Sequence, residues 1–243
     1  MNDINKILVF TATFNEADNI GKLIYDIFSF APQVDVMVID DNSPDGTGEI
    51  LDKLATTYSR LSVVHRKGKL GLGTAHLQAM EYSVKNNYDA LITMDADFSH
   101  HPKYLPQMLA LLEKFDFVIG SRYVEGGGVG YGIIRIFISK TANILVRTLL
   151  SIKLKECTTS YRGFRKDLLV KILNNKIIST GYSFFFEMVY FVCTETKNVT
   201  EFPIYFADRT EGESKISKRE IIYGVTTLFK LFIKRVTGYL PFD

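Results

Sequence analysis

The chain of 243 residues has no tryptophan and only two cysteines. Cys157 and Cys193 are too few for a disulfide framework, so we expect two reduced thiols in a cytoplasmic protein. An excess of charge of one sign is also lacking, because 29 basic and 27 acidic side chains give a net charge of +2. The sequence therefore argues against a partner nucleic acid that is bound through bulk charge.

Long apolar runs are missing as well. No stretch reaches the roughly 18 uninterrupted apolar residues of a membrane-spanning helix. The N-terminus has neither the basic region nor the cleavage site of a signal peptide. The remaining composition, 47% hydrophobic and 23% charged, is that of a globular protein and excludes disordered, collagen-like and coiled-coil chains.

Apolar runs alternate with amphipathic stretches along the first half of the chain. The expected strands are residues 6–13, 34–40, 61–65, 90–95 and 115–121, and the expected helices are residues 19–30, 47–58, 73–86 and 104–114. This alternation predicts an α/β fold with a mostly parallel central sheet flanked by helices on both faces. Ligands of such sheets bind at the carboxyl ends of the strands. Polar runs follow the expected strands at residues 13–16, 40–43, 95–97 and 121–123, which predicts a site at that edge.

The acidic pair Asp95 and Asp97 follows an apolar run directly. Two carboxylates one residue apart at a strand end can face one hard cation, and Mg²⁺ or Mn²⁺ completes its shell with substrate phosphates. This spacing suits an enzyme that neutralises a nucleoside diphosphate leaving group. A loop with two surface acids is the alternative, and the spacing by itself leaves it open.

Two neighbouring loops have both a binding and a structural interpretation. Asp41 is suited equally to a base or ribose contact and to turn chemistry. Ser43 and Asp45 are better interpreted as turn residues, with Ser43, Asp45 or Thr47 as the N-cap of the next helix. The run 67–73 precedes a helix and is similar to a phosphate loop, but it has neither the P-loop order nor Gly-x-Gly-x-x-Gly.

Four cations stand beside candidate loops: Arg122, Arg135, Arg209 and Lys215. The last two flank a polar segment suited to a mobile lid. For each cation, a solvated surface position is the alternative.

Three further titratable residues stand out. His100 and His101 are interpreted as packing and capping groups rather than as ligands. Glu187 lies in an apolar segment and needs a partner, so it either orients an arginine or acts as a base.

Together these motifs resemble the dolichol-phosphate mannosyltransferases, which are polyprenyl-phosphate sugar synthases of glycosyltransferase family 2. The resemblance rests on the ordered runs 13–16, 40–47, 69–74, 94–102 and 120–123, and then on 126–129, 158–164, 181–184, 208–209 and 214–215. It covers about residues 6–217. It implies the GT-A fold and a divalent metal, Mg²⁺ or Mn²⁺.

Carried across residue by residue, the resemblance implies a donor site and an acceptor site. The nucleoside would be held by Ala12, Phe14, Glu16, Ile39 and Asp41. The metal and the diphosphate would be held by Asp95, Asp97 and Ser99, with the backbone of Ala96 nearby. The donor diphosphate would be clamped by Arg209 and Lys215, and the lipid phosphate would be bound by Arg122 and Arg135. The catalytic set would be Asp97, Arg122, Arg135 and Lys215.

The reaction implied is inverting transfer of a hexose from a nucleotide sugar, with GDP-mannose favoured, to a polyprenyl or dolichyl monophosphate. The acceptor phosphate is already ionised near pH 7, so it needs positioning more than it needs a general base. One alternative is a family 2 enzyme with another donor, such as UDP-glucose, or with a saccharide acceptor, for which Glu187 is the first candidate base. The other is an inactive scaffold that recruits a membrane protein partner.

The C-terminal segment has its own pattern. We expect a GT-A domain over residues 1–217 and an amphipathic helix within 218–243. An arc of about 120–140° holds Ile221, Ile222, Val225, Leu228, Phe229, Phe232, Ile233 and Val236. The opposite side holds Thr226, Thr227, Lys230 and Lys234. This predicts a peripheral helix on the cytoplasmic face of a membrane, with the apolar segment 133–154 beside it; packing on the domain core is the alternative.

Overall fold

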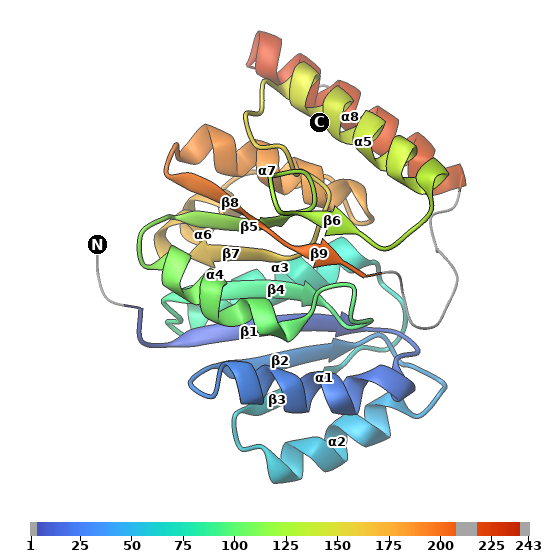
Figure 1. The fold of residues 1–243 in the computed structure, drawn as a ribbon, viewed down its shortest axis with the longest axis vertical. Coiled ribbons are helices and arrows are strands. Elements are labelled where there is room, and N and C mark those ends of the chain that lie inside the picture. Colours follow the sequence, from blue (N-terminus) through green and yellow to red (C-terminus); the bar gives the residue numbers. More distant parts are fainter. Residues whose placement is uncertain (1–3, 208–217, 239–243) are drawn as a thin grey trace.

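The computed structural model describes residues 4–207 and 218–238 (Figure 1). Its centre is a seven-stranded sheet with the order β3-β2-β1-β4-β7-β5-β8. The strands are β1 (Ile7–Thr13), β2 (Asp35–Asp40), β3 (Leu61–His65), β4 (Ala90–Asp95), β5 (Phe117–Ser121), β7 (Arg162–Arg165) and β8 (Val199–Pro203). Strand β7 is antiparallel to both neighbours, and the other pairs are parallel. The predicted mostly parallel sheet is confirmed.

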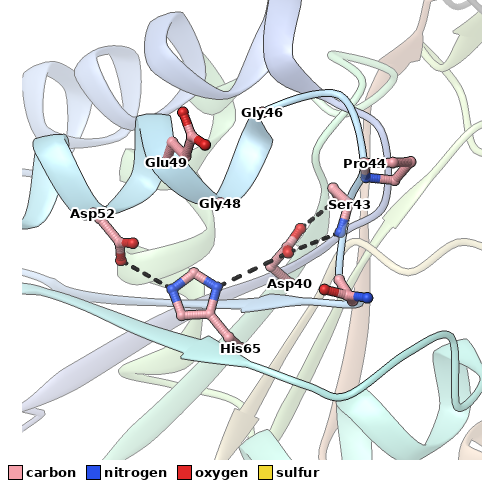
Figure 2. Close-up of a pocket in the computed structure, with 9 residues that line it drawn as sticks. Asp40, Ser43, Pro44, Gly46, Gly48, Glu49, Asp52 and His65 are labelled. Atoms are coloured by element: carbon pink, nitrogen blue, oxygen red, sulfur yellow. Dashed lines mark hydrogen bonds and ion pairs between the residues drawn. The ribbon is translucent and has the colours of Figure 1, made fainter.

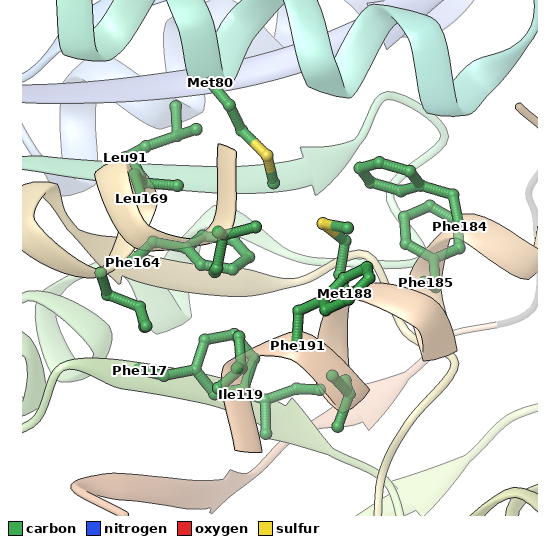
Figure 3. Close-up of a cluster of buried hydrophobic side chains, with 14 of the residues drawn as sticks. Met80, Leu91, Phe117, Ile119, Phe164, Leu169, Phe184, Phe185, Met188 and Phe191 are labelled. Carbon is green, nitrogen blue, oxygen red and sulfur yellow. The ribbon is translucent and has the colours of Figure 1, made fainter. Parts of the chain in front are cut away.

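Helices cover both faces of this sheet. One face packs against α1 (Ala17–Phe30), α2 (Thr47–Thr57) and α4 (Leu105–Leu112), and the other against α3 (Leu72–Lys85), α6 (Lys166–Leu173) and α7 (Ser183–Glu195). Side chains alternate between the faces of a strand, so in β1 Leu8 and Phe10 join one core while Ile7 and Val9 join the other. Figure 3 shows the core beneath α3, where Met80 lies near Phe184 and Met188.

Most expected elements end within about two residues of the observed ones, but the middle of the sheet differs. The expected helix 104–114 begins as a 3₁₀ turn, η1 (Pro102–Tyr104), and α4 ends at Leu112. Strand β7 was not expected, because four residues are too few for a periodic signal. It lies between β4 and β5, and the missing side chain of Gly163 admits α4, since a Cβ there would stand 2.8 Å from Leu112.

Two long helices, α5 (Ile133–Leu150) and α8 (Lys218–Thr237), lie side by side at one end of the molecule (Figure 1). Arg235 of α8 donates to the carbonyl of Leu149 at the end of α5 (2.8 Å). Neither these nor any other helix in the described ranges is long and apolar enough to cross a bilayer.

Helix α8 turns most of its predicted apolar arc away from the domain. Its contact with α7 is made by a narrow seam that includes the buried Leu231 and Thr227, and Lys234 Nζ lies 4.6 Å from the Phe191 ring. Five arc residues are between 58% and 66% exposed: Ile221, Ile222, Val225, Phe229 and Val236. The alternative in which this arc packs on the core is therefore wrong for these five.

Helix α5 is arranged in the same way. It buries Asn143, Val146 and Leu150 and exposes the opposite side. We call the exposed apolar side chains of both helices the apolar face: Ile133, Ile134, Phe137, Ile138, Ile144 and Leu145 of α5 with Ile221, Ile222, Val225, Phe229 and Val236 of α8. So many exposed apolar residues on adjacent helices indicate a surface that binds something.

The orientation of α8 predicts unequal effects of two truncations. Leu231→Ala removes a fully buried side chain and should lower the free energy of unfolding by about 2–5 kcal/mol. Phe229→Ala removes a side chain that is 60% exposed and should change it by less than about 0.5 kcal/mol. Urea denaturation of both variants measures the difference, and equal losses would contradict this orientation.

Candidate functional site

Three predicted donor residues lie side by side at the carboxyl ends of neighbouring strands. Strand β1 has β2 on one side and β4 on the other, and Ala12 pairs with Ile39 in β2 and with Asp95 in β4. The chain order reverses here, since β2 and β3 extend the sheet to one side of β1 and β4 begins the other. Open α/β sheets bind ligands at this switch point.

The loop after β4 gathers oxygen atoms. Asp97 is buried, and its Oδ1 accepts from the Ser99 amide (3.0 Å). Asp95 Oδ1 accepts from Ser160 Oγ (2.5 Å). The Ser99 hydroxyl is buried and has no hydrogen-bond partner among the described residues. Two carboxylates beside an unsatisfied hydroxyl fit a hard cation, although in the described ranges no group of three or more acidic, histidine or cysteine side chains is arranged to hold a metal ion.

His100 fixes this loop from behind. Its Nδ1 accepts from the Asp95 amide (3.2 Å), so the proton lies on Nε2, which donates to Thr159 Oγ1 (2.8 Å). Burial lowers the pKa of His100 to about 3, so the ring stays neutral. His101 Nδ1 accepts from the Lys103 amide at the start of η1. The interpretation of both histidines as packing and capping groups is confirmed.

The part of the site that was predicted to hold the nucleoside contains an unexpected arginine. Arg66 is buried, and its Nε donates to Asp41 Oδ1 while its Nη1 donates to Thr74 Oγ1. It ties the end of β2 to the first turn of α3. The sequence feature that could have indicated this role is the position of Arg66 directly after the predicted strand 61–65.

The aromatic and acidic side chains of the loop after β1 lie beside this region. Lys69 Nζ lies 4.4 Å from the Phe14 ring centroid. Glu16 Oε2 accepts from Asn19 Nδ2 (3.0 Å) at the start of α1. Ala96 is buried directly after β4.

A pocket of about 290 Å³ opens nearby, between the ends of β2 and β3 and helix α2 (Figure 2). Polar side chains that line this pocket pair with one another. His65 forms a hydrogen bond with Asp52 (2.9 Å), and the Ser43 hydroxyl donates to Asp40 (2.5 Å). The turn interpretation of Ser43 is thereby confirmed.

The expected N-cap of α2 was wrong. Gly46 occupies that position with φ of 91°, a backbone conformation that glycine adopts without strain. Asp45 does keep a turn role, since its Oδ1 accepts from the Thr47 amide (3.0 Å) and hydroxyl (2.6 Å).

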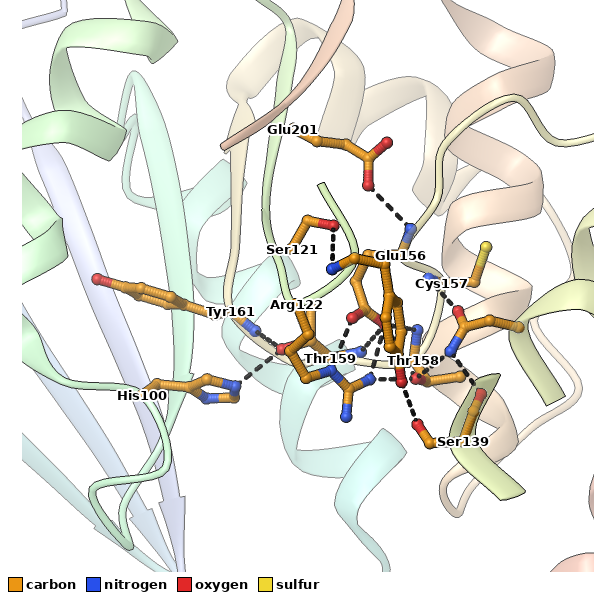
Figure 4. A network of polar contacts seen from close by, with 12 residues as sticks. His100, Ser121, Arg122, Ser139, Glu156, Cys157, Thr158, Thr159, Tyr161 and Glu201 are labelled. Carbon is orange, nitrogen blue, oxygen red and sulfur yellow. Dashed lines mark hydrogen bonds and ion pairs between the residues drawn. The ribbon is translucent and has the colours of Figure 1, made fainter. Parts of the chain in front are cut away.

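Arg122 at the end of β5 is held by a buried carboxylate that the sequence did not single out (Figure 4). Its Nε and Nη2 donate to the two oxygens of Glu156 (2.7 and 2.8 Å), and Nη2 also donates to Thr158 Oγ1 (2.7 Å). Burial alone would raise the pKa of Glu156, but the charge and hydrogen bonds of Arg122 outweigh it and hold that pKa below its ordinary value. The pair is therefore ionised.

The structure brings the two predicted phosphate-binding arginines to one side chain. Arg122 Nη1 donates to the hydroxyl of Tyr131 (3.0 Å), and the Arg135 guanidinium lies 4.5 Å from the ring centroid of the same tyrosine. Tyr131 was not predicted, and its place within the glycine-rich loop before Arg135 was the available signal.

We call Arg122, Tyr131 and Arg135 the arginine cluster. The segment 156–162 joins this cluster to the loop after β4. Glu156 contacts Arg122 at one end, and Thr159 and Ser160 contact His100 and Asp95 at the other. Arg162 fixes the segment from inside, because its guanidinium donates to three backbone carbonyls, those of Cys157, Thr159 and Phe185. It is 1% exposed, and burial lowers its pKa to about 9.

Glu187 was expected to orient an arginine or to act as a base. Instead, its two carboxylate oxygens accept from the amides of Ile178 and Ser179 (2.9 Å each), and no arginine in the described ranges pairs with it. It therefore fixes the loop before α7. Arg209 and Lys215 lie outside the described residues.

Comparison with known proteins identifies relatives along most of the chain. A family model described as "Glycosyl transferase family 2" matches residues 8–173. A protein named polyprenol monophosphomannose synthase from Mycolicibacterium smegmatis is 38% identical over 219 residues, covering 89% of this chain and 83% of its own. An undecaprenyl-phosphate mannosyltransferase from Micrococcus luteus is 37% identical over 213 residues, covering 87% and 88%.

Solved structures share the fold at low identity. Glucosyl-3-phosphoglycerate synthase from Mycobacterium tuberculosis, with Mn²⁺, UDP and glucosyl-3-phosphoglycerate, matches with a TM-score of 0.64 at 18% identity over 95% of this chain and 80% of its own. TarS from S. aureus, with UDP-GlcNAc, also has a TM-score of 0.64, at 17% identity over 98% and 68%. The GT-A fold is thus confirmed.

The buried ion pair predicts a pH-dependent loss of stability. Glu156→Gln leaves Arg122 without its counter-charge and should lower the free energy of unfolding by about 3–5 kcal/mol at pH 7. Because the folded-state pKa of Glu156 is lowered, the wild-type advantage persists above the unfolded pKa of about 4.3 and shrinks as pH falls below it. Urea titrations of both proteins from pH 7 to pH 3.5 measure this, and a pH-independent difference would contradict the ionised pair.

Proposed function

This chain belongs to glycosyltransferase family 2, and on that basis we propose that it transfers mannose from GDP-mannose to a polyprenyl monophosphate, with inversion at the sugar. The names of both relatives, a polyprenol monophosphomannose synthase and an undecaprenyl-phosphate mannosyltransferase, support the acceptor and the sugar. The observation that carries the proposal is that one segment, 156–162, contacts both halves of the proposed site. It contacts Asp95 at one end and the arginine cluster at the other.

Asp95, Asp97 and Ser99 would hold Mg²⁺ or Mn²⁺ beside the donor diphosphate. The unsatisfied Ser99 hydroxyl and the two carboxylates fit such an ion, and Mn²⁺ accompanies UDP in a structure of the same fold. When bound, the ion supplies charge that offsets the departing diphosphate. The lid cations Arg209 and Lys215 are proposed to add to this charge.

The protein side chains then have separate tasks. Asp41, with Ala12, Phe14, Glu16 and Ile39, is proposed to hold the nucleoside beside the carboxyl ends of β1 and β2. Arg122 and Arg135 are proposed to orient the acceptor phosphate, which attacks the sugar without needing its proton removed. Arg122 suits this role because Glu156 fixes the plane of its guanidinium.

Nucleotide release tests the reaction. With GDP-mannose and a polyprenyl monophosphate, the purified protein should release GDP, and omission of the lipid should abolish release. UDP-glucose in place of GDP-mannose should support little release. Release of nucleotide only with a saccharide acceptor would overturn the proposal, and so would no release with either acceptor.

The Asp97→Ala variant extends this assay to the metal. It should lower turnover by orders of magnitude, because it removes a buried carboxylate from the proposed ion site. Circular dichroism checks that the fold is kept. Full activity of this variant in excess chelator would contradict the metal assignment.

We also propose that the apolar face rests on a bilayer, with the enzyme peripheral on the cytoplasmic side of the membrane. A polyprenyl acceptor lies in that bilayer, and α5 begins two residues after Tyr131 and carries Arg135 in its first turn. The apolar face would therefore place the arginine cluster at the lipid surface. The exposed basic side chain of Lys140 on α5 favours anionic headgroups.

Single charges should separate this surface from others. Phe137→Glu and Phe229→Glu each place a carboxylate in the apolar face and should lower sedimentation with phosphatidylglycerol-containing vesicles at least several-fold. Val170→Glu adds the same charge to α6, where Val170 is 40% exposed outside that face, and should leave sedimentation unchanged. Equal sedimentation of all three variants and the wild type would reject this surface.

A further inference from the structure

Tyr131 holds an unusual position between the two arginines. The side chain is 6% exposed, its hydroxyl accepts from Arg122 Nη1 at 3.0 Å, and Arg135 lies over its ring. A phenol both accepts and donates. Among the described residues, the Tyr131 hydroxyl accepts this one hydrogen bond and donates none. A buried donor without an acceptor is costly unless a ligand supplies one.

The pairing of Arg122 decides where that ligand approaches. Glu156 and Thr158 occupy Nε and Nη2, so the remaining donor edge of the guanidinium is at Nη1. Nη1 is also the atom that contacts the Tyr131 hydroxyl. An anion that binds the remaining edge of Arg122 therefore meets the hydroxyl of Tyr131 at the same point, and the Arg135 guanidinium lies 4.5 Å from the centroid of the same ring.

We propose that the Tyr131 hydroxyl is a third ligand of the acceptor phosphate, donating its proton to a phosphate oxygen that Arg122 also contacts. The inference rests on the proposed function, because it assumes that a phosphate monoester binds here. Tyr131 thus acts in acceptor recognition and leaves the donor site untouched. The start of α5, which has no side-chain cap, adds the positive end of a helix dipole beside it.

A structural role would look different. If Tyr131 served only to prop Arg122, its hydroxyl would act through that guanidinium alone. The bidentate contact with Glu156 and the contact with Thr158 already fix the guanidinium plane without Tyr131. Its hydroxyl is therefore available for the ligand.

Binding of a short isoprenyl monophosphate of about 15 carbons, measured by calorimetry in detergent, tests this. Tyr131→Phe should raise the dissociation constant of this lipid about 10- to 100-fold, the loss of one hydrogen bond to a charged group, and leave that of GDP unchanged. Tyr123→Phe is the matched control. Its hydroxyl pairs with Ser139 (2.6 Å) and its ring also faces Arg122, so this variant should change lipid binding by less than about twofold.

A double-mutant cycle separates direct contact from propping. In an Arg122→Lys background, where GDP binding reports that the fold is kept, Tyr131→Phe should still weaken lipid binding about tenfold. No further loss in that background, a change below twofold in the single variant, or an equal change in Tyr123→Phe would overturn the inference. If the wild-type protein binds and uses the lipid but Tyr131→Phe is unimpaired, this inference alone fails. If the wild-type protein neither binds nor uses it, the proposed function fails as well.

Discussion

The fully buried carboxylate of Glu156 is the constraint around which the site is organised. A charge that is removed from water must be paired and hydrogen-bonded. Here Arg122 supplies the opposite charge, and the hydroxyl and the amide of Thr158 both donate to Glu156 Oε1. These bonds fix the beginning of the segment 156–162. They also fix which edge of Arg122 is left to face a ligand.

The same segment also contacts the other half of the site, which is the loop after β4. Arg162 is buried without a carboxylate within ion-pair distance among the described residues, and backbone carbonyls satisfy its guanidinium. Those carbonyls belong to the segment and to α7, so Arg162 joins the segment to α7. Thr159 and Ser160 then meet His100 and Asp95. Displacement of any part of this network would alter the spacing between the proposed acceptor and donor sites.

The apolar face determines how the proposed site would be oriented on a membrane. Both α5 and α8 use a narrow seam to pack and leave their broader apolar sides outside. A helix in a water-soluble protein normally does the reverse. This inversion is understandable if a bilayer covers the exposed sides, because the acceptor that we propose lies in that bilayer.

The sequence by itself determined the local pattern. Strand and helix periods predicted the α/β sheet, and the polar runs after the strands predicted a site at the edge where Asp95 lies, because parallel strands end at one edge. Ala12 and Ile39 were expected there only from the family resemblance. The apolar arc of 221–236 was visible as well, since it depends only on a period of 3.6 residues. Which side of α8 faces the domain was not visible, because both the arc and Leu231 are apolar.

Tertiary structure alone decided the contacts between residues far apart in the chain. Glu156 is 34 residues from Arg122, and Ser160 is 65 residues from Asp95, so no local spacing could relate them. Glu187 was a candidate base in the sequence, but in the structure its two carboxylate oxygens accept hydrogen bonds from two backbone amides. Periodicity reports only which side chains share a face of one element. The partner of a buried charge is set by how the elements pack, because the cost of leaving that charge unpaired is paid only after water has been excluded.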